Sequence, residues 1–398
     1  MTGALPLGTS SHDQTRSNVS QGGWPVPTSA YLHVPFCRHR CGYCNFSVIA
    51  GRDELAEDFL DAIDRELSRI TAPLPMQTVF IGGGTPTHLS LSQIDRLFDS
   101  LDRWLPRAPG AETSVEANPE DITQDKLALL ARRGVNRISL GVQSFDAGKL
   151  QVLQRTHSRE SAQAAIEQAA ETIGNVSIDL IFSAPNESLA SWCNDLQIAL
   201  SLPISHLSTY ALTFEKGTSF WSQRLRGRLQ GAGEEEELAM YQAAIQKAGE
   251  AGLKHYEISS FARDGYRCRH NLAYWQGRGW FAAGPGAARF VEGRREVNHR
   301  STTTYLKRIQ ADQSPTEESE LITREQWACE RAAFGVRMID GVDLRAIAEE
   351  TGIDVELLRE PELTRCRELG LLEGSSHFYR LTPQGILMAD TVATAFLG

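Results

Sequence analysis

The chain has 398 residues, of which 41% are hydrophobic and 23% charged, proportions typical of a globular protein with room for two domains. A formal net charge of -10 argues against non-specific binding to nucleic acid or to an anionic membrane surface. Because no apolar run reaches transmembrane length and the seven cysteines show no pairing pattern, we expect a protein of the reducing cytoplasm.

The first 29 residues differ in composition from the rest. They are rich in Gly, Ser, Thr, Gln and Pro, and they lack the basic start and apolar centre of a signal peptide. This composition predicts a disordered tail over residues 1–29. Residues 30–300 alternate predicted strands and helices and form the first expected domain, while residues 301–398 are mainly helical and form the second.

Three cysteines follow the first predicted strand in the spacing C-x-x-x-C-x-x-C, namely Cys37, Cys41 and Cys44. Their thiolates can hold three corners of a cubane iron–sulfur cluster, which ordinarily takes four cysteines. The fourth iron would then stay open to a small molecule with an amino and a carboxylate group, as a vacant position does in catalytic metal sites. A structural zinc site that includes His33 or His39 is the alternative, although the second cysteine pair usual in such sites is missing.

Short apolar strands and helix-favouring segments alternate over most of the first domain. The predicted strands are 30–34, 78–81, 113–116, 137–142, 176–182 and 207–212. The predicted helices are 55–70, 92–104, 124–133, 159–172, 189–200 and 234–249. Strands that alternate with helices pair in a parallel sheet with right-handed crossovers, which forms either an open doubly wound sheet or a barrel.

Polar residues near the carboxyl ends of these strands favour the barrel. They are the glycine run at 82–84 with Thr85, then Glu116, Gln143 and Asp179. Glycines let a ligand approach the backbone closely. Glu116 can accept hydrogen bonds from ribose hydroxyls, and Asp179 must be hydrogen-bonded or paired among its apolar neighbours. We expect an incomplete barrel of six strands with a lateral opening for a large substrate.

After about residue 254 the alternation ends. One further predicted strand, 254–261, precedes the run His270-Asn271-Leu272-Ala273-Tyr274-Trp275 and a glycine-rich stretch at 277–286. In the second domain, helices at 344–351 and 355–369 and a hairpin at 371–381 follow the order of a winged helix. The second of these helices mixes acidic and basic residues, whereas a DNA-recognition helix needs a cationic face. We therefore interpret this domain as a lid or packing module and expect no nucleic-acid partner.

The cysteine loop and the glycine run together resemble the signature of the radical S-adenosylmethionine (SAM) superfamily. The order of Tyr31, the cysteines, GGGTP, Glu116, GVQSF, LQR.H, IDLI and Tyr210-Ala211 is similar to the oxygen-independent coproporphyrinogen III oxidase family. The resemblance implies an α/β fold with a partial barrel of six parallel strands, a [4Fe–4S] cluster on the three cysteines, and SAM on the open iron. The implied SAM-site residues are Tyr31, Tyr43, Gly83, Gly84, Thr85, Glu116, Gln143, Arg155, Asp179, Ala211 and Ala288.

Two features resemble the heme-chaperone (HemW) branch of that family more than its oxidases. Phe46 stands where the oxidases carry a fourth cysteine, and residues 270–275 match the HNxxYW motif of the branch. The branch implies heme as a further cofactor, with His270 as an iron ligand and Tyr274 and Trp275 packed on the porphyrin. A structural histidine among core aromatics is the other interpretation. The oxidases of the family bind two SAM molecules. Residues 182–188 and 282–286 depart from the family pattern, and these departures concern the substrate side and the second SAM site that the resemblance implies.

The resemblance leaves two functions open. A heme chaperone would bind heme and pass it to an acceptor protein, for instance a respiratory one, whether or not SAM is cleaved. An oxygen-independent coproporphyrinogen III oxidase would instead use the radical formed from SAM to decarboxylate two propionates of a porphyrinogen. The sequence does not decide whether the chain is an enzyme.

Overall fold

The computed structural model describes residues 23–398. Residues 1–22, most of the predicted tail, lie outside the described residues. The end of the predicted tail packs against the fold, because the ring centroid of Trp24 lies 5.1 Å from that of Trp327 and 6.0 Å from that of Phe290. Trp24 brings far more apolar surface than the glycines and serines before it, which explains why this segment joins a core.

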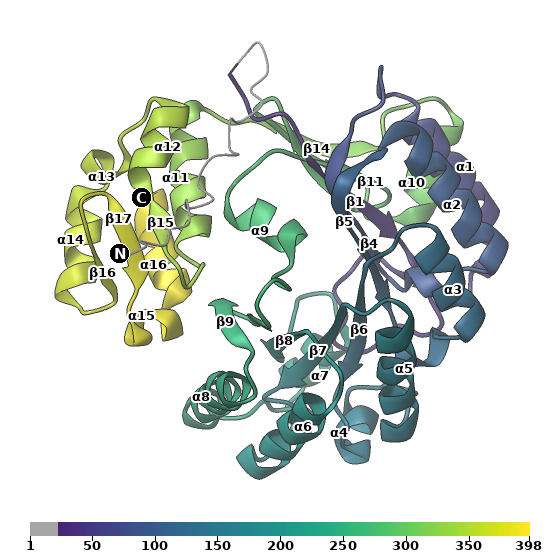
Figure 1. Ribbon diagram of the computed structural model, residues 1–398, viewed down its shortest axis with the longest axis horizontal. Coiled ribbons are helices and arrows are strands. Elements are labelled where there is room, and N and C mark those ends of the chain that lie inside the picture. Colours follow the sequence, from purple (N-terminus) through teal and green to yellow (C-terminus); the bar gives the residue numbers. More distant parts are fainter. Residues whose placement is uncertain (1–22) are drawn as a thin grey trace, which may run out of the picture.

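A curved parallel sheet of six strands forms the centre of the molecule, as the sequence predicted (Figure 1). These strands are β1 (Ser29–Val34), β4 (Met76–Gly83), β5 (Arg107–Ala117), β6 (Arg137–Gln143), β7 (Val176–Phe182) and β8 (His206–Ala211). Each strand pairs in parallel with the next one along the chain. The result is the expected partial barrel of an α/β fold.

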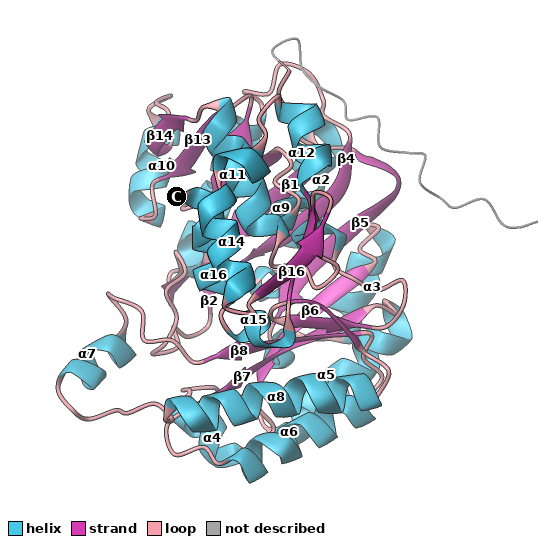
Figure 2. Ribbon diagram, turned by 90° about the vertical axis from the view of Figure 1, so that its left-hand side faces the viewer, coloured by secondary structure: helices cyan, strands magenta, loops and turns pink. Residues whose placement is uncertain are grey.

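Helices connect these strands and cover the outer face of the sheet, and Figure 2 shows α5, α6 and α8 side by side beneath β6–β8. The helices are α1 (Ala56–Leu67), α2 (Leu91–Trp104), α3 (Gln124–Arg132), α4 (Ala147–Val152), α5 (Arg159–Thr172), α6 (Leu189–Ser201), α7 (Ser219–Leu225) and α8 (Glu234–Glu250). Ser90 and Ser158 form capping boxes that fix the starts of α2 and α5. None of the described helices is long and apolar enough to cross a membrane.

Side chains of the central strands alternate between an apolar outer face and a polar inner face. In β6, Ile138, Leu140 and Val142 pack in the core beneath the helices, whereas Arg137 and Ser139 face the interior of the barrel. The other five strands contribute the inward residues Tyr31, Phe80, Glu116, Asp179 and Ser208. Because so polar an interior cannot pack as a dry core, it is available for ligands.

The sheet continues beyond both edges of this centre to twelve strands. Beside β1 lie the parallel β11 (Trp280–Ala283) and the antiparallel β12 (Ala288–Val291), β13 (Arg294–Asn298) and β14 (Thr316–Leu321). Beside β8 lie β10 (Ser260–Ala262) and β9 (Lys254–Glu257), and β2 (Phe36–Cys37) pairs separately with β3 (Ile49–Ala50). The predicted strand 254–261 is thus a hairpin, because a turn at 258–259 bonds the Ser259 N–H to the Glu257 carboxylate at 3.2 Å.

Residues 324–398 form a helical unit with a small three-stranded sheet, on the left of Figure 1. Its elements are α11 (Arg324–Gly335), β15 (Val342–Asp343), α12 (Leu344–Thr351), α13 (Val355–Leu358), α14 (Glu360–Glu368), β16 (Leu372–Ser375), β17 (Phe378–Leu381), α15 (Pro383–Leu387) and α16 (Ala389–Leu397). The order of helices and hairpin is the predicted winged-helix order. The predicted helix 355–369 is divided at Arg359, since Pro361 opens α14 and cannot donate the backbone bond that continuity would need.

Residues 301–321, which the sequence assigned to the second domain, extend the large sheet. The helix α10 (Thr302–Gln310) packs on α1, where the Tyr305 hydroxyl donates to the Glu66 carboxylate at 2.6 Å, and β14 pairs with β13. Five of the six residues of β14 are exposed, which hid the strand from a search for apolar runs. The helix α9 (Arg269–Trp275) lies between the barrel and the C-terminal unit (Figure 1).

Candidate cofactor and ligand site

The cysteine loop lies at the carboxyl end of the barrel, directly after β1. Cys37 ends β2, and Cys41 and Cys44 follow in the connection to β3. The Cys44 N–H donates to the Cys41 carbonyl at 3.1 Å, which turns the loop back on itself. The Thr85 N–H donates to the Phe36 carbonyl at 2.7 Å, and the Thr85 hydroxyl lies 3.5 Å from the Cys37 sulfur. These contacts tie the loop to the glycine run after β4.

Two glycines make this packing possible. A Cβ atom at Gly84 would lie 2.5 Å from the carbonyl oxygen of Phe36, and a Cβ atom at Gly42 would lie 2.4 Å from the ring of Phe220. Phe220 is buried in α7, and its N–H donates to the Gly42 carbonyl at 2.9 Å. The segment that carries α7 therefore anchors the cysteine loop, although sequence analysis made no prediction for it.

The three cysteines line one cavity of about 140 Å³ together with most of the predicted SAM-site residues. The predicted residues in this lining are Tyr43, Gly83, Gly84, Thr85, Glu116, Gln143, Arg155 and Asp179. Phe46 lies on the same wall with 64% of its surface exposed. The fold thus brings together residues that are more than a hundred positions apart in the chain.

His33 is not free to ligate a metal. Its Nε2 lies 2.9 Å from the Ser47 carbonyl and its Nδ1 lies 3.1 Å from the Tyr31 hydroxyl, and burial lowers its pKa to about 4. Among residues 23–398, no three His, Cys, Asp or Glu side chains converge on a point suited to a single metal ion. The zinc alternative with His33 is therefore disfavoured, whereas a cubane has its irons at separate corners and does not need convergent cysteines.

Two buried carboxylates face the interior beside the cysteines. Glu116 accepts a hydrogen bond from the Gly83 N–H at 2.8 Å, and Asp179 accepts one from the Ser139 hydroxyl at 3.3 Å. Burial raises the pKa of Glu116 to about 7 and that of Asp179 to about 6. Both groups keep lone pairs that can accept hydrogen bonds from the hydroxyl or ammonium groups of a ligand.

Arg155 links the cysteine loop to the strands. Its guanidinium donates to the Asn118 side-chain oxygen at 2.6 Å and to the Gly141 carbonyl at 2.8 Å. The same guanidinium lies 3.7 Å from the Cys41 sulfur, so it places a positive charge beside a cysteine. Asn118 in turn donates to the Thr85 hydroxyl at 2.7 Å. Asn118 thus joins two predicted site residues, although it was not itself among the predicted ones.

Gln143 ends β6 in a backbone conformation that residues other than glycine rarely adopt, with φ at 64°. The next two residues are held by one carboxylate, because the Ser144 hydroxyl and the Phe145 N–H donate to Asp195 at 2.6 and 2.9 Å. The Lys149 ammonium lies 3.2 Å from this buried carboxylate and also forms an ion pair with the buried Glu187. These contacts fix the backbone directly after Gln143, whose side chain lines the wall of the cavity.

A second cavity, of about 530 Å³, occupies the rest of the barrel interior. It shares Phe46, Glu116, Ser139 and Asp179 with the first cavity, so the two are adjacent. Its lining also includes four further predicted residues, namely Tyr31, His270, Tyr274 and Ala288. Ala211, the remaining predicted SAM-site residue, lines neither of these cavities and ends β8 opposite Phe182.

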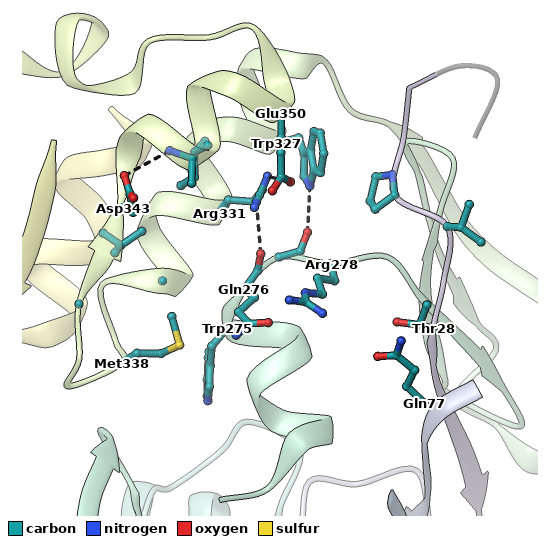
Figure 3. Close-up of a pocket in the computed structure, with 18 residues that line it drawn as sticks. Thr28, Gln77, Trp275, Gln276, Arg278, Trp327, Arg331, Met338, Asp343 and Glu350 are labelled. Carbon is teal, nitrogen blue, oxygen red and sulfur yellow. Dashed lines mark hydrogen bonds and ion pairs between the residues drawn. The ribbon is translucent and has the colours of Figure 1, made fainter. Parts of the chain in front are cut away.

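The helix α9 presents its motif residues to two different cavities. His270 and Tyr274, one turn apart, face the barrel, whereas Trp275 lines a cavity of about 400 Å³ between the barrel and the C-terminal unit (Figure 3). The motif therefore does not form the single porphyrin surface that the sequence suggested. Residues four positions apart on a helix, such as His270 and Tyr274, lie on the same face. A residue five positions away, such as Trp275, points in a different direction.

His270 is buried and neutral, because burial lowers its pKa to about 3. Its Nδ1 lies 2.9 Å from the Thr78 hydroxyl, and its Nε2 lies 2.9 Å from the Tyr274 hydroxyl. The imidazole also stacks on the Phe80 ring, with 5.2 Å between centroids. For His270 to ligate a heme iron, one of these two hydrogen bonds must open.

The donor set of the first cavity fits a [4Fe–4S] cluster that carries SAM. Cysteine sulfur is the usual protein ligand of such clusters. Burial raises the pKa of Cys37 to about 12, so this thiol loses its proton when metal binds and not before. Glu116, Asp179 and the backbone of residues 83–85 offer acceptors and donors to the amino acid and ribose parts of SAM.

Comparison with known proteins agrees with this geometry. The Radical SAM superfamily model matches residues 31–197, and the HemN C-terminal domain model matches residues 322–388. The heme chaperone HemW of Bacillus subtilis is 36% identical over 93% of this chain and 99% of its own length, and HemW of Mycobacterium tuberculosis H37Rv is 33% identical over 94% and 95%. The coproporphyrinogen III oxidase HemN of Escherichia coli, a radical SAM enzyme, has the same fold, with a TM-score of 0.82 and 23% identity over 93% of this chain and 90% of HemN. The chain belongs to the HemW family of radical SAM proteins.

Proposed function

We propose that this chain is a heme chaperone that binds heme in the larger barrel cavity and passes it to an acceptor protein. The observation that carries the proposal is the position of His270 and Tyr274 on the wall of a 530 Å³ cavity. This volume lies within the roughly 300–1,000 Å³ of cofactor and small-molecule sites. The rings of Tyr31, Phe80 and Trp280 line the same cavity and suit a planar tetrapyrrole.

The cysteine cavity would hold the cluster and SAM. Cys37, Cys41 and Cys44 would ligate three irons, and the backbone of residues 83–85 with Glu116 and Asp179 would bind SAM. When bound, the cluster can supply one electron to the sulfonium of SAM. Arg155 keeps a positive charge beside the cluster, and the two carboxylates orient SAM by accepting its hydrogen bonds.

A coproporphyrinogen III oxidase is the second candidate, and the likeness of the fold to HemN favours it. Phe46 weighs against the oxidase. This exposed ring lies on the wall shared by both cavities, at the position where the oxidases carry a fourth cysteine. A phenyl ring can neither ligate iron nor exchange protons there.

The test of the proposal is a titration with ferric heme, followed by the Soret absorption. We expect His270→Ala to weaken heme binding by about 10- to 100-fold, the range seen when support for a metal centre is removed. Trp275→Ala, a change on the same helix but in the other cavity, should leave the affinity close to that of the unchanged chain. Loss of heme binding in Trp275→Ala alone would contradict the barrel location.

A parallel assay separates the two candidates. The protein is reconstituted anaerobically, its iron and sulfide content is confirmed, and it is incubated with SAM, a strong reductant and coproporphyrinogen III. We expect no decarboxylated product by mass spectrometry. Product above background would favour the oxidase and would make Phe46 a tolerated variation.

We also assign the protein to the cytoplasm, where thiols stay reduced. All seven cysteines are free thiols, which is the state that cluster assembly on the cysteine loop requires. Hemoproteins of the respiratory chain are one class of acceptor that such a chaperone would serve. Fractionation of cells, with the heme-loaded protein followed by its absorption, tests the location.

A further inference from the structure

Arg137 is the first residue of β6 and points into the barrel. Strand alternation places it on the same face as Ser139 and Gln143, and its side chain lines the 530 Å³ cavity. Only 2% of the residue is exposed. At about 3.3 Å per residue, Arg137 lies roughly 20 Å along the strand from Gln143. It therefore marks the end of the cavity that is farthest from the cysteine loop.

The guanidinium of Arg137 has few partners. Its Nη1 lies 3.3 Å from the Asn175 side-chain oxygen and 3.5 Å from the Tyr266 carbonyl, both long for hydrogen bonds. Its Nε is buried and donates no hydrogen bond. Within residues 23–398, no carboxylate lies within ion-pair distance of this group. A buried cation without a counter-ion is costly, so an anion that enters the cavity gains by pairing with it.

The other titratable groups around Arg137 do not neutralise it. Asp179, which feels the charge of Arg137, accepts its hydrogen bond from Ser139 and lies beyond ion-pair distance. His206 is uncharged, because burial lowers its pKa, and Cys268 remains a thiol, because burial raises its pKa to about 11. Glu112, a further buried carboxylate near Cys268, accepts hydrogen bonds from the backbone N–H groups of Arg269 and His270 at 3.0 Å and lies beyond ion-pair distance of Arg137.

The cavity between the barrel and the C-terminal unit provides a contrast (Figure 3). Arg331 is paired there with Glu350 at 2.6 Å. Arg278 lines the same cavity but is exposed, so water can solvate its guanidinium. Because Arg278 is exposed whereas only 2% of Arg137 is, Arg278 serves as a matched control on the other side of α9.

We propose that Arg137 binds a propionate carboxylate of heme and so fixes the propionate edge of the tetrapyrrole at this end of the barrel cavity. The inference rests on the proposed function, since it assigns the carboxylate anchor of the same heme site. A guanidinium can donate two parallel N–H bonds to one carboxylate, which gives direction as well as attraction. The Nε of Arg137, which has no partner in the chain, is one of the two donors that such a pair uses.

The experiment compares two ligands in the full-length protein, hemin and hemin dimethyl ester, which lacks the carboxylate charges. Both are titrated by Soret absorption, and the ratio of the two dissociation constants is the readout. We expect hemin to bind the unchanged chain about 10- to 100-fold more tightly than its ester, as a charge-assisted hydrogen-bond pair allows. In Arg137→Met the ratio should fall close to one while the affinity for the ester stays the same. Arg137→Lys should restore part of the ratio, and Arg278→Met should leave it unchanged.

Two outcomes would overturn the inference while leaving the heme chaperone intact. One is a full preference for hemin in Arg137→Met, and the other is loss of that preference in Arg278→Met. Equal affinity of the unchanged chain for the two ligands overturns it without any variant, which covers the case in which Arg137→Met does not fold. Failure of the unchanged chain to bind either ligand contradicts the proposed function itself, and this result differs from all the others.

Discussion

The two ends of the barrel interior are built differently. At the cysteine end, Thr85, Asn118 and Arg155 are joined by hydrogen bonds of 2.6 and 2.7 Å, and the network extends to the Cys41 sulfur. At the opposite end, Arg137 is buried, yet its Nε has no hydrogen bond and its charge has no ion-pair partner among the described residues.

This difference separates two ways of preparing a site. The cysteine end is rigid before any ligand arrives, because each polar group holds another in place. The opposite end keeps an uncompensated charge, so its polar groups are satisfied only when a ligand is bound. The first arrangement suits a resident cofactor, and the second suits a cargo that enters and leaves.

Removal of one cluster ligand should have the largest effect, because it should abolish cluster binding at one end of the barrel and leave heme binding at the other end unchanged. In Cys41→Ala, two cysteines remain for the cluster, so we expect loss of its iron, sulfide and visible absorption after reconstitution. Heme affinity should change little, because Cys41 lines only the smaller cavity. Cys193→Ala, which changes a thiol on α6 outside both cavities, is the control and should retain a full cluster. A parallel loss of heme binding in Cys41→Ala would show that the two ends are not independent.

The anchor of the cysteine loop can be weakened without touching a ligand. Phe220→Ala removes a buried ring from its contact with Gly42, and a phenylalanine-to-alanine change in a core costs about 3 to 5 kcal/mol. We expect a lower free energy of unfolding in urea and a cluster that chelators extract faster. Phe378→Ala, where the ring is exposed on the C-terminal unit, should change stability by no more than about 0.5 kcal/mol. If chelators extracted the cluster at equal rates from the two variants, α7 would not be what stabilises the cysteine loop.

A pH titration tests the wall that the two cavities share. Burial raises the pKa of Asp179 from 3.8 to about 6, so the folded chain holds this proton more tightly than the unfolded chain. The corresponding stability of the cofactor-free protein is present below pH 4 and is lost as the pH rises through about 6, by at most about 3 kcal/mol. Asp179→Asn should flatten this part of the curve when urea unfolding is compared at pH 5 and pH 7.5. The same slope in the variant would assign the pH dependence to another group.

Much of the fold could be predicted because the apolar outer face of the sheet repeats every second residue. β7 and α5 begin and end where the sequence predicted, whereas β5 begins six residues earlier than the predicted 113, in a stretch with Pro109 and Gly110 that does not favour strands. The strand β14 was missed for a related reason, since its side chains are polar and exposed.

For the candidate site, strand ends and family motifs identified the cysteines and most of the smaller cavity. Phe220 could not be found in this way, because it acts through a contact between segments that are far apart in sequence. Arg137 left a signal in the alternation of Arg137, Ser139 and Gly141 with apolar residues, but it begins its strand, whereas chemistry is expected at the carboxyl end. Tyr274 and Trp275 line different cavities, and this follows from helical geometry once residues 270–275 are known to form a helix.

The position of α9 has a mechanical consequence. The helix is seven residues long, about two turns, and its backbone hydrogen bonds make it move as one body. Tyr274 lines the barrel cavity. The Arg337 guanidinium of the C-terminal unit lies over the adjacent Trp275, 5.3 Å from the centroid of the Trp275 ring. A displacement of Tyr274 would therefore also displace Trp275 and its contact with Arg337, because no hinge separates the two residues.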